Sequence, residues 1–438
     1  MKKAMLIAEI PNAFRPEPLG DEDMEKFYEP TMSVRTGEDY DSPIDDIYDR
    51  CCEPRARNAS LLMGHMGCGK STELTCLAER LRSVGYPVAI IFCDRELDGE
   101  NKTFPDVMIL MADALLQLAQ ENKCALNRDD LETIRTFWTA SIEKEDIIFD
   151  GTDLTVQAEA GVGAPKLLGG LIKLFANLKT SLKYNEESRT VYREQIVKYN
   201  SQWLGAMNRI ADQITRQDGK QPILIFEDLD KGDTWNVFSG HGRQLTGVSF
   251  PVVYTFPIAY FYSPNFAEME SFFQINHLPM IKTRTIDGNP YAEGIAAIRA
   301  IVGRRAELAL FEDGVLDELI DKTGGCLRHL FYAISKAARW TERKRETQIS
   351  MALAKRALYE IRDSLSARID GKRKQDDFLV EVYSGNHTEI TDHDELLNMM
   401  KALTVLEYNG QRWYNVHPLI EEYLRDIGKL PPKKTNEG

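Results

Sequence analysis

The residues best suited to chemistry lie at 64–72, where the chain reads Gly-His-Met-Gly-Cys-Gly-Lys-Ser-Thr. This segment matches G-x-x-x-x-G-K-[ST] at every fixed position. In that pattern the glycines let backbone N–H groups point at a phosphate, Lys70 reaches the β- and γ-oxygens, and Ser71 ligates Mg²⁺. We therefore expect a nucleoside triphosphate bound with Mg²⁺. The predicted phosphate-binding residues are Gly64, His65, Met66, Gly67, Cys68, Gly69, Lys70, Ser71 and Thr72.

A second chemical cluster lies at 222–231, where an apolar strand runs into three acids. Hydrolysis of a triphosphate needs one carboxylate for Mg²⁺ and another to orient or deprotonate the attacking water. We assign Glu227 to the metal and Asp228 to the water, with Asp230 as a supporting acid. The alternative is a strand end with solvated acids, which Lys70 upstream disfavours. The predicted catalytic residues are Asp228, Glu227 and Lys70, and the predicted metal ligands are Ser71, Glu227 and Asp228.

The elements that must position these residues alternate between strand and helix from residue 58 onward. An apolar run at 61–63 precedes the glycine-rich loop, apolar residues at helical spacing follow it, and 87–92 forms the next strand. This alternation predicts an α/β fold, a parallel sheet with helices on both faces. A glycine-rich turn that binds nothing is the alternative, and this context disfavours it.

Two further residues are candidates for sensing the nucleotide. Thr255, on a third strand at 251–256, could lie between the two phosphate-binding strands; a place at the edge of the core is the alternative. Arg328 opens a helix after Gly324-Gly325, so its guanidinium could turn back onto phosphate. An exposed arginine at a helix start is the alternative for that residue.

Length, charge and cysteines narrow the class of protein. The 438 residues suggest roughly two to four domains. A net charge of −14 argues against the whole molecule being a nonspecific nucleic-acid binder. The seven cysteines include no C-x-x-C pair, which favours a reduced compartment without a zinc site. With no signal-peptide pattern and no apolar run of membrane-spanning length, we expect a cytoplasmic protein.

These residues resemble the AAA+ and STAND class of P-loop ATPases, particularly the origin-recognition-like branch common in bacterial signalling and defence proteins. The resemblance rests on 64–72, on the Glu-Asp-x-Asp-Lys segment 227–231, and on 324–328. It implies ATP and Mg²⁺ as ligands, Thr255 as the sensor-1 residue and Arg328 as the sensor-2 residue. It also implies an ATP-driven change between a compact state and an open or assembled state.

Two departures from that family pattern shape the expected function. Glu227 stands where the family usually has Asp, and no arginine finger stands out before 278–283, the fourth predicted strand. A ring-forming motor is therefore disfavoured. We expect a slow ATPase switch that couples nucleotide state to assembly or to activation of a protein partner or effector, in signalling or anti-phage defence. Self-association is an open possibility.

The expected organisation has five parts. Helices are predicted after residue 290 in the lid, and the last part before the tail resembles a winged-helix domain. The parts are an extended N-terminal arm at 1–42, a P-loop ATPase domain at 43–287 with an insertion at 123–188, a helical lid at 288–347, a winged-helix domain at 348–428 and a disordered tail at 429–438.

The insertion contains a basic amphipathic stretch at 166–179. Its lysines lie off an apolar face, so it could contact a membrane or dock on a partner. We favour packing on its own protein, because Gly169-Gly170 weakens a free-standing helix. The predicted apolar face is Leu167, Leu168, Leu171, Ile172, Leu174, Phe175 and Leu178.

The predicted winged helix raises the question of DNA binding. Its candidate reading helix, 391–403, carries four acidic or histidine residues at 392–395 and only Lys401 as a basic residue. Carboxylates facing phosphate are costly, so packing on the lid or on a partner is favoured over DNA reading. Asn409-Gly410 predicts the hairpin that forms the wing. A nucleotide-licensed DNA-binding initiator or regulator remains the alternative function.

Overall fold

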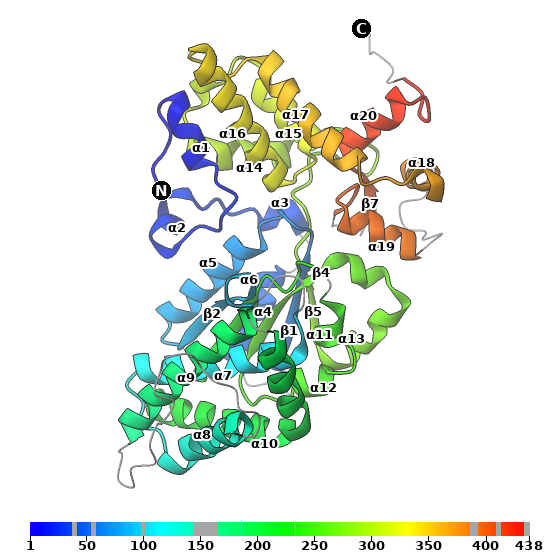
Figure 1. Cartoon of the computed structure of the whole chain (residues 1–438). Helices are drawn as coiled ribbons and strands as arrows, with labels where there is room; N and C mark the ends of the chain where they lie inside the picture. Colours follow the sequence, from blue (N-terminus) through cyan, green and yellow to red (C-terminus); the bar gives the residue numbers. More distant parts are fainter. Residues whose placement is uncertain are drawn as a thin grey trace.

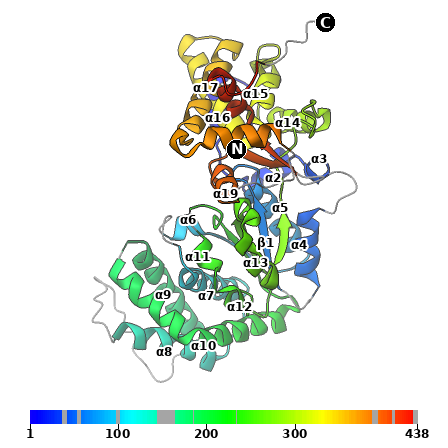
Figure 2. The same ribbon diagram turned by 90° about the vertical axis from the view of Figure 1, so that its right-hand side faces the viewer.

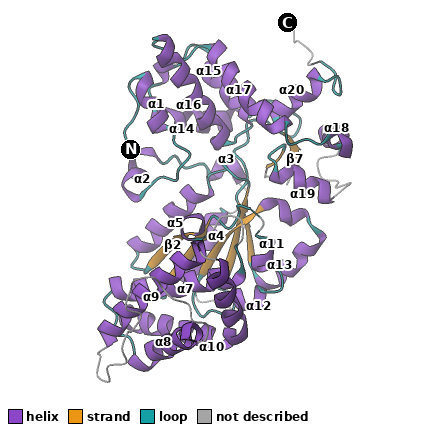
Figure 3. Ribbon diagram, in the orientation of Figure 1, coloured by secondary structure: helices purple, strands orange, loops and turns teal. Residues whose placement is uncertain are grey.

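The computed structural model describes residues 1–36, 42–53, 58–97, 102–143, 164–184, 186–232, 234–385, 393–408 and 413–432. A parallel sheet occupies the middle of the molecule, with a helical bundle at one end and the lid and C-terminal helices at the other (Figure 1). In the described ranges, the strands form this sheet and one small hairpin, and helices surround them (Figure 3).

The central sheet has five strands in the order β2-β3-β4-β1-β5, and every pairing is parallel. All residues of β1, β3 and β4 are buried, as expected when helices cover both faces of a parallel sheet. The predicted α/β fold class is confirmed, and β4 lies between β1 and β3. The strands are β1 (Ala59–Gly64), β2 (Val88–Phe92), β3 (Ile223–Glu227), β4 (Val252–Pro257) and β5 (Gln274–His277).

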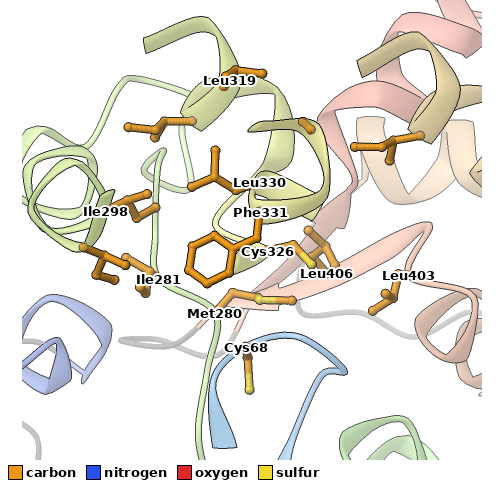
Figure 4. Close-up of a cluster of buried hydrophobic side chains, with 14 of the residues drawn as sticks. Cys68, Met280, Ile281, Ile298, Leu319, Cys326, Leu330, Phe331, Leu403 and Leu406 are labelled. Atoms are coloured by element: carbon orange, nitrogen blue, oxygen red, sulfur yellow. The ribbon is translucent and has the colours of Figure 1, made fainter. Parts of the chain in front are cut away.

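The strand predicted at 278–283 is wrong. The strand that follows β4 is β5, which ends at His277. Residues 278–283 form a connection to the lid. Their apolar side chains are buried under the lid helices instead of in the sheet: Met280 and Ile281 pack with Phe331 beneath the lid (Figure 4). An apolar run reports burial, and burial alone does not distinguish a strand from a buried connection.

Helices cover the sheet and extend below it. The helix predicted after the glycine-rich loop is present as α5. The helices of this part are α4 (Pro43–Cys52), α5 (Lys70–Ser83), α6 (Cys93–Glu96), α7 (Phe104–Glu121), α8 (Arg128–Glu143), α9 (Ala164–Tyr184), α10 (Glu186–Asp218), α11 (Trp235–Phe238), α12 (Gly242–Leu245), η2 (Ile258–Tyr262), η3 (Pro264–Phe266) and α13 (Ala267–Phe272).

The insertion is part of a helical bundle, in which α7, α8, α9 and α10 pack against one another (Figure 2). Six of the seven predicted apolar-face residues of α9 are buried, Phe175 completely and Leu171 with 1% of its surface exposed. Phe175 stacks on Trp203 of α10, with ring centroids 6.0 Å apart. Packing on its own protein is confirmed, and the membrane contact suggested for 166–179 is wrong because that face is already covered.

Phe175→Asp should therefore lower the free energy of unfolding by about 3 kcal/mol or more, because it removes a core ring and buries a carboxylate. Lys173→Asp, on the exposed side of the same helix, should change it by less than about 0.5 kcal/mol. Denaturant unfolding monitored by circular dichroism measures both. Equal stability of the two variants would contradict the buried face.

The N-terminal arm is not extended, in contrast to the prediction. Its proline and acid content suggested a linker, but its scattered apolar residues form short buried helices. Phe14, which is 1% exposed, meets Phe331 of the lid edge to face at 5.3 Å. The elements are η1 (Ile7–Glu9), α1 (Ile10–Ala13), α2 (Asp21–Phe27) and α3 (Met32–Thr36).

The predicted lid helices and the C-terminal helices and hairpin are present. Leu430 is 6% exposed, so the start of the predicted disordered tail packs on the fold, whereas 433–438 and the Asn409-Gly410 turn lie outside the described residues. Within the described ranges, every helix is too short or too polar to cross a bilayer. The elements are α14 (Ala292–Arg305), η4 (Leu308–Leu310), α15 (Val315–Thr323), α16 (Leu327–Lys344), α17 (Met351–Ser366), η5 (Gly371–Arg373), α18 (Gln375–Ser384), α19 (His393–Lys401), antiparallel β6 (Val405–Tyr408) and β7 (Trp413–Val416), and α20 (Pro418–Asp426).

Candidate nucleotide-binding site

The glycine-rich loop connects the end of β1 to the start of α5. Gly67 and Gly69 have positive φ angles of 84° and 107°, and Gly69 caps the N-terminus of α5. A Cβ at Gly67 would lie 2.6 Å from Cβ of Arg328. Only glycine fits there, because the lid helix α16 begins directly against the loop. Because α5 begins at Lys70, directly after Gly69, its first N–H groups lie at the loop, as in an anion-binding helix terminus.

Lys70 is buried and fully engaged. Its ammonium group donates to the carbonyl oxygens of Gly64 and His65 at 2.9 Å each and lies 2.8 Å from Asp230 Oδ2. Burial would lower the pKa of Lys70, but the charge and hydrogen bond of Asp230, together with the other acidic groups nearby, outweigh burial and raise that pKa. Burial likewise opposes ionisation of Asp230, but the charge and hydrogen bond of Lys70, together with the charge of Lys231, outweigh burial and lower the pKa of that carboxyl. Asp230 is thus paired with the ammonium group that a bound phosphate would also contact.

Ser71 and Glu227, two of the predicted Mg²⁺ ligands, lie within hydrogen-bond distance of each other. Ser71 Oγ donates to Glu227 Oε2 at 3.2 Å, and the other carboxylate oxygen is buried with no hydrogen-bond partner among the residues that the structure describes. Burial, followed by the nearby charge of Asp230, raises the pKa of Glu227 to about 8. These hard oxygens fit Mg²⁺. Within the described residues no three His, Cys, Asp or Glu side chains form a metal site, so the ion would share its shell with phosphate and water.

Asp228 lies beside Glu227 but faces other partners. Its φ of 65° is left-handed, and its carboxylate lies 2.5 Å from the ammonium group of Lys231. Lys231 also reaches Asp94 at 3.1 Å, and Lys102 donates to the Asp228 carbonyl at 2.8 Å. Asp94, Lys102 and Lys231 had no assigned role in the sequence analysis. Asp94 follows β2 closely, and β2 pairs with β3, so the strand order would have indicated it.

Thr255 is completely buried behind the acidic turn. Its hydroxyl accepts from Leu229 N at 3.0 Å and donates to Phe226 O at 3.2 Å. It therefore holds in place the backbone that carries Glu227 and Asp228. Contact between Thr255 and a γ-phosphate stays a prediction.

A cavity of about 340 Å³ opens beside Lys70 and Ser71. Its walls come from the glycine-rich loop, the ends of β2 and β3, the lid and the N-terminal arm. Arg328 is among the wall residues, and contact between its guanidinium and a phosphate stays a prediction. The residues that the other parts add include Pro18, Leu19, Phe27 and Tyr28 from the arm, Asp94, Arg95, Asp228, Asp230 and Lys231 from the strand ends, and Ile301, Arg305, Leu327 and Phe331 from the lid.

Arg35 joins the arm to the glycine-rich loop and was missed in the sequence analysis. It is 1% exposed, and its guanidinium donates to the carbonyl oxygens of Cys68 at 2.8 Å and Pro279 at 2.5 Å. Those acceptors lie far from Arg35 in sequence, so no local pattern indicates the contact. The arm is thereby tied to the loop that it helps to roof.

The C-terminal module, residues 351–432, reaches the glycine-rich loop directly. The amide of Glu407, in β6, donates to Nε2 of His65 at 2.8 Å. Burial, followed by the charge of Lys70, lowers the pKa of His65 to about 3, so its imidazole is neutral and can accept this bond. Tyr408 also donates its hydroxyl proton to the carbonyl of Gly324 in the lid at 2.8 Å.

Comparison with protein-family models finds no match, and comparison with curated proteins finds none. Among solved structures, the chain is similar to Aeropyrum pernix ORC2 in ADPNP–ADP complexes, with 10% identity and a TM-score of 0.42 over 95% of this chain and 98% of that one. It is also similar to a Walker-type ATPase of Pyrococcus abyssi, with 13% identity and a TM-score of 0.41 over 94% of this chain and 99% of that one. Similarity to Aeropyrum pernix ORC1 in complex with DNA extends over 88% of this chain and 92% of that one, with 13% identity and a TM-score of 0.38. At such TM-scores, functional conclusions rest on the site's own residues.

Proposed function

We propose that this chain is an ATP-binding and slowly ATP-hydrolysing switch of the AAA+ kind, in which the nucleotide controls the docking of the C-terminal module. The hydrogen bond from Glu407 N to His65 Nε2 carries this proposal. His65 belongs to the loop that would wrap the phosphates, and Lys70 in that loop must exchange Asp230 for phosphate. A change in the loop would therefore act directly on β6.

The arrangement of acids supports hydrolysis at a low rate. Asp228 would orient the attacking water and accept its proton, as the new bond to the γ-phosphorus forms and the bridging P–O bond breaks with its electron pair leaving on ADP. Ser71 and Glu227 would hold Mg²⁺, which neutralises charge on the phosphates. The ion pair with Lys231 occupies the Asp228 carboxylate, so the attacking water would have to share it, which favours slow turnover.

The docked module has further contacts that a nucleotide would have to loosen. Lys401 donates to the hydroxyl of Tyr260 at 2.7 Å, and His393 Nδ1 lies 2.6 Å from the Tyr262 carbonyl. Both tyrosines lie in η2, which directly follows β4. Release of this surface would expose it to a partner or effector, in the signalling or defence roles suggested by the family resemblance.

The DNA-binding alternative is favoured by one observation, the exposed Lys372 and Arg373 at η5. Against it, α19 has two acids in its first turn and uses Lys401 for docking. Salt-dependent duplex binding that disappears in Lys372→Ala/Arg373→Ala would support the alternative. If the wild type binds no duplex at low salt, or if the double variant binds it as the wild type does, the protein switch stays the proposed function.

Hydrogen exchange at the Glu407 amide tests the switch. ATP should change its exchange rate by about tenfold or more, corresponding to a coupling of about 1.4 kcal/mol, and Lys70→Ala should abolish the change. The amide of His417, which donates to Thr404 O within the module at 2.8 Å, is the control for unfolding of the module itself. Equal Glu407 exchange with no nucleotide, ADP and ATP would contradict the proposal.

A further inference from the structure

The short helix α6 lies at the phosphate end of the cavity. It directly follows β2, and Phe92 at the end of β2 is in register with Glu227 at the end of β3. Ligands of parallel α/β sheets bind at the carboxyl ends of the strands. Arg95 of α6 lines the same cavity as Lys70 and Asp228. Its positive charge therefore lies in the part of the cavity where the terminal phosphate of ATP would bind.

The guanidinium of Arg95 is available to a ligand. Arg95 is exposed and lies over the ring of Phe92, with its central carbon 4.3 Å from the ring centroid. In the part of the chain that the structure describes, no carboxylate forms an ion pair with it. The neighbouring Lys231, in contrast, is paired with Asp94 and Asp228.

Contacts with two parts of the chain hold α6. Near the acids that follow β3, Asp94 binds both Lys231 and Lys102. Two lysines of the insertion helix α9 also hold α6: Lys183 donates to the Arg95 carbonyl at 2.8 Å, and Lys179 lies 3.0 Å from Glu96. The insertion therefore reaches the nucleotide cavity through α6.

We infer that Arg95 is a catalytic arginine supplied by the chain itself, which contacts the terminal phosphate and stabilises the charge that develops during hydrolysis. Lys183 and Lys179 are positioning residues, so the insertion regulates hydrolysis by placing α6. This inference rests on the proposed function. Arg95 takes the place of the arginine finger that the sequence lacks before residues 278–283. The insertion, in turn, has the role of holding α6 in place.

Arg95→Ala should lower kcat by about 100-fold or more, as expected for loss of a group that stabilises transition-state charge. The Kd for ATP should change by less than about threefold, because the contact strengthens mainly in the transition state. Rapid-quench single-turnover hydrolysis and fluorescent-nucleotide titration of the full chain measure the two quantities. Arg95→Lys should retain part of the rate, and millimolar guanidinium should partly restore hydrolysis in Arg95→Ala.

Lys183→Ala removes a bond from α9 to α6 without leaving a buried charge unpaired, unlike Lys179→Ala, which would strand buried Asp113. It should lower kcat about tenfold, without rescue by guanidinium. Lys173→Ala, on the exposed side of α9, is the matched control and should match the wild type.

The outcomes separate this inference from the proposed function. A wild-type rate in Arg95→Ala, or a Kd that rises as much as kcat falls, overturns the role of Arg95 while ATP hydrolysis by the wild type still stands. A wild-type rate in Lys183→Ala overturns the role of the insertion. If the wild type binds or hydrolyses no ATP, both proposals fail together.

Discussion

Lys70→Ala should abolish measurable ATP binding, raising the Kd by about 100-fold or more. The variant loses the ammonium group that would reach the β- and γ-phosphates. It also leaves Asp230, whose side chain is 7% exposed, without its cation. A buried carboxylate that has lost its partner destabilises a protein by about 3–5 kcal/mol, so the variant should also unfold at lower denaturant concentration. Isothermal titration and denaturant unfolding measure the two effects.

The double variant Lys70→Ala/Asp230→Asn separates binding from folding. Neutralising Asp230 removes the unpaired charge, so the double variant should regain most of the lost stability. It should still fail to bind ATP, because no cation has returned to the loop. If the double variant binds ATP as the wild type does, then Lys70 does not hold phosphate and the proposed site is wrong.

The site was most predictable where its chemistry is local in sequence. The glycine-rich loop and the acids after β3 are short segments whose spacing reflects backbone geometry. The lid start is similar, because Gly324 and Gly325 have positive φ angles of 59° and 82° at the turn before Arg328. Residue types at fixed offsets therefore indicated these features without any knowledge of the tertiary fold.

Contacts between distant segments could not be predicted in this way. Arg35 meets the Cys68 carbonyl, and His65 meets the amide of Glu407, across 342 residues. Backbone acceptors and donors have no side-chain signature, so these bonds become visible only when the fold places the segments together. The folded N-terminal arm is a similar case, because its short helices are stabilised by packing on the lid and not by helix propensity.

Amphipathic and apolar patterns predicted burial but not the partner. The apolar face of α9 is compatible with a membrane, a partner or its own bundle, and the structure shows the bundle. Residues 278–283 are apolar for contact with the lid and not for a place in the sheet. In both cases the pattern correctly predicted that the side chains are buried. Which part of the protein buries them depends on the whole fold.

Asp228→Asn should keep ATP binding and lower the rate of hydrolysis by about 100-fold or more, the usual range for loss of a general base. The substitution suits the backbone, because Asn, like Asp, tolerates the left-handed conformation with φ of 65° found here. The loss therefore reports the carboxylate and not a distorted turn. Thermal unfolding should confirm equal folding, and separation of bound nucleotide should show ATP retained on the variant after the wild type has converted it to ADP.

Asn is nearly the same size and shape as Asp, so Asp228→Asn removes the negative charge while the volume of the side chain and its tolerance of the left-handed conformation stay the same. Normal hydrolysis by Asp228→Asn would show that the water is activated elsewhere. Glu227, and Asp230 once Lys70 has exchanged it for phosphate, would then be the remaining acids at or after the end of β3 able to do so.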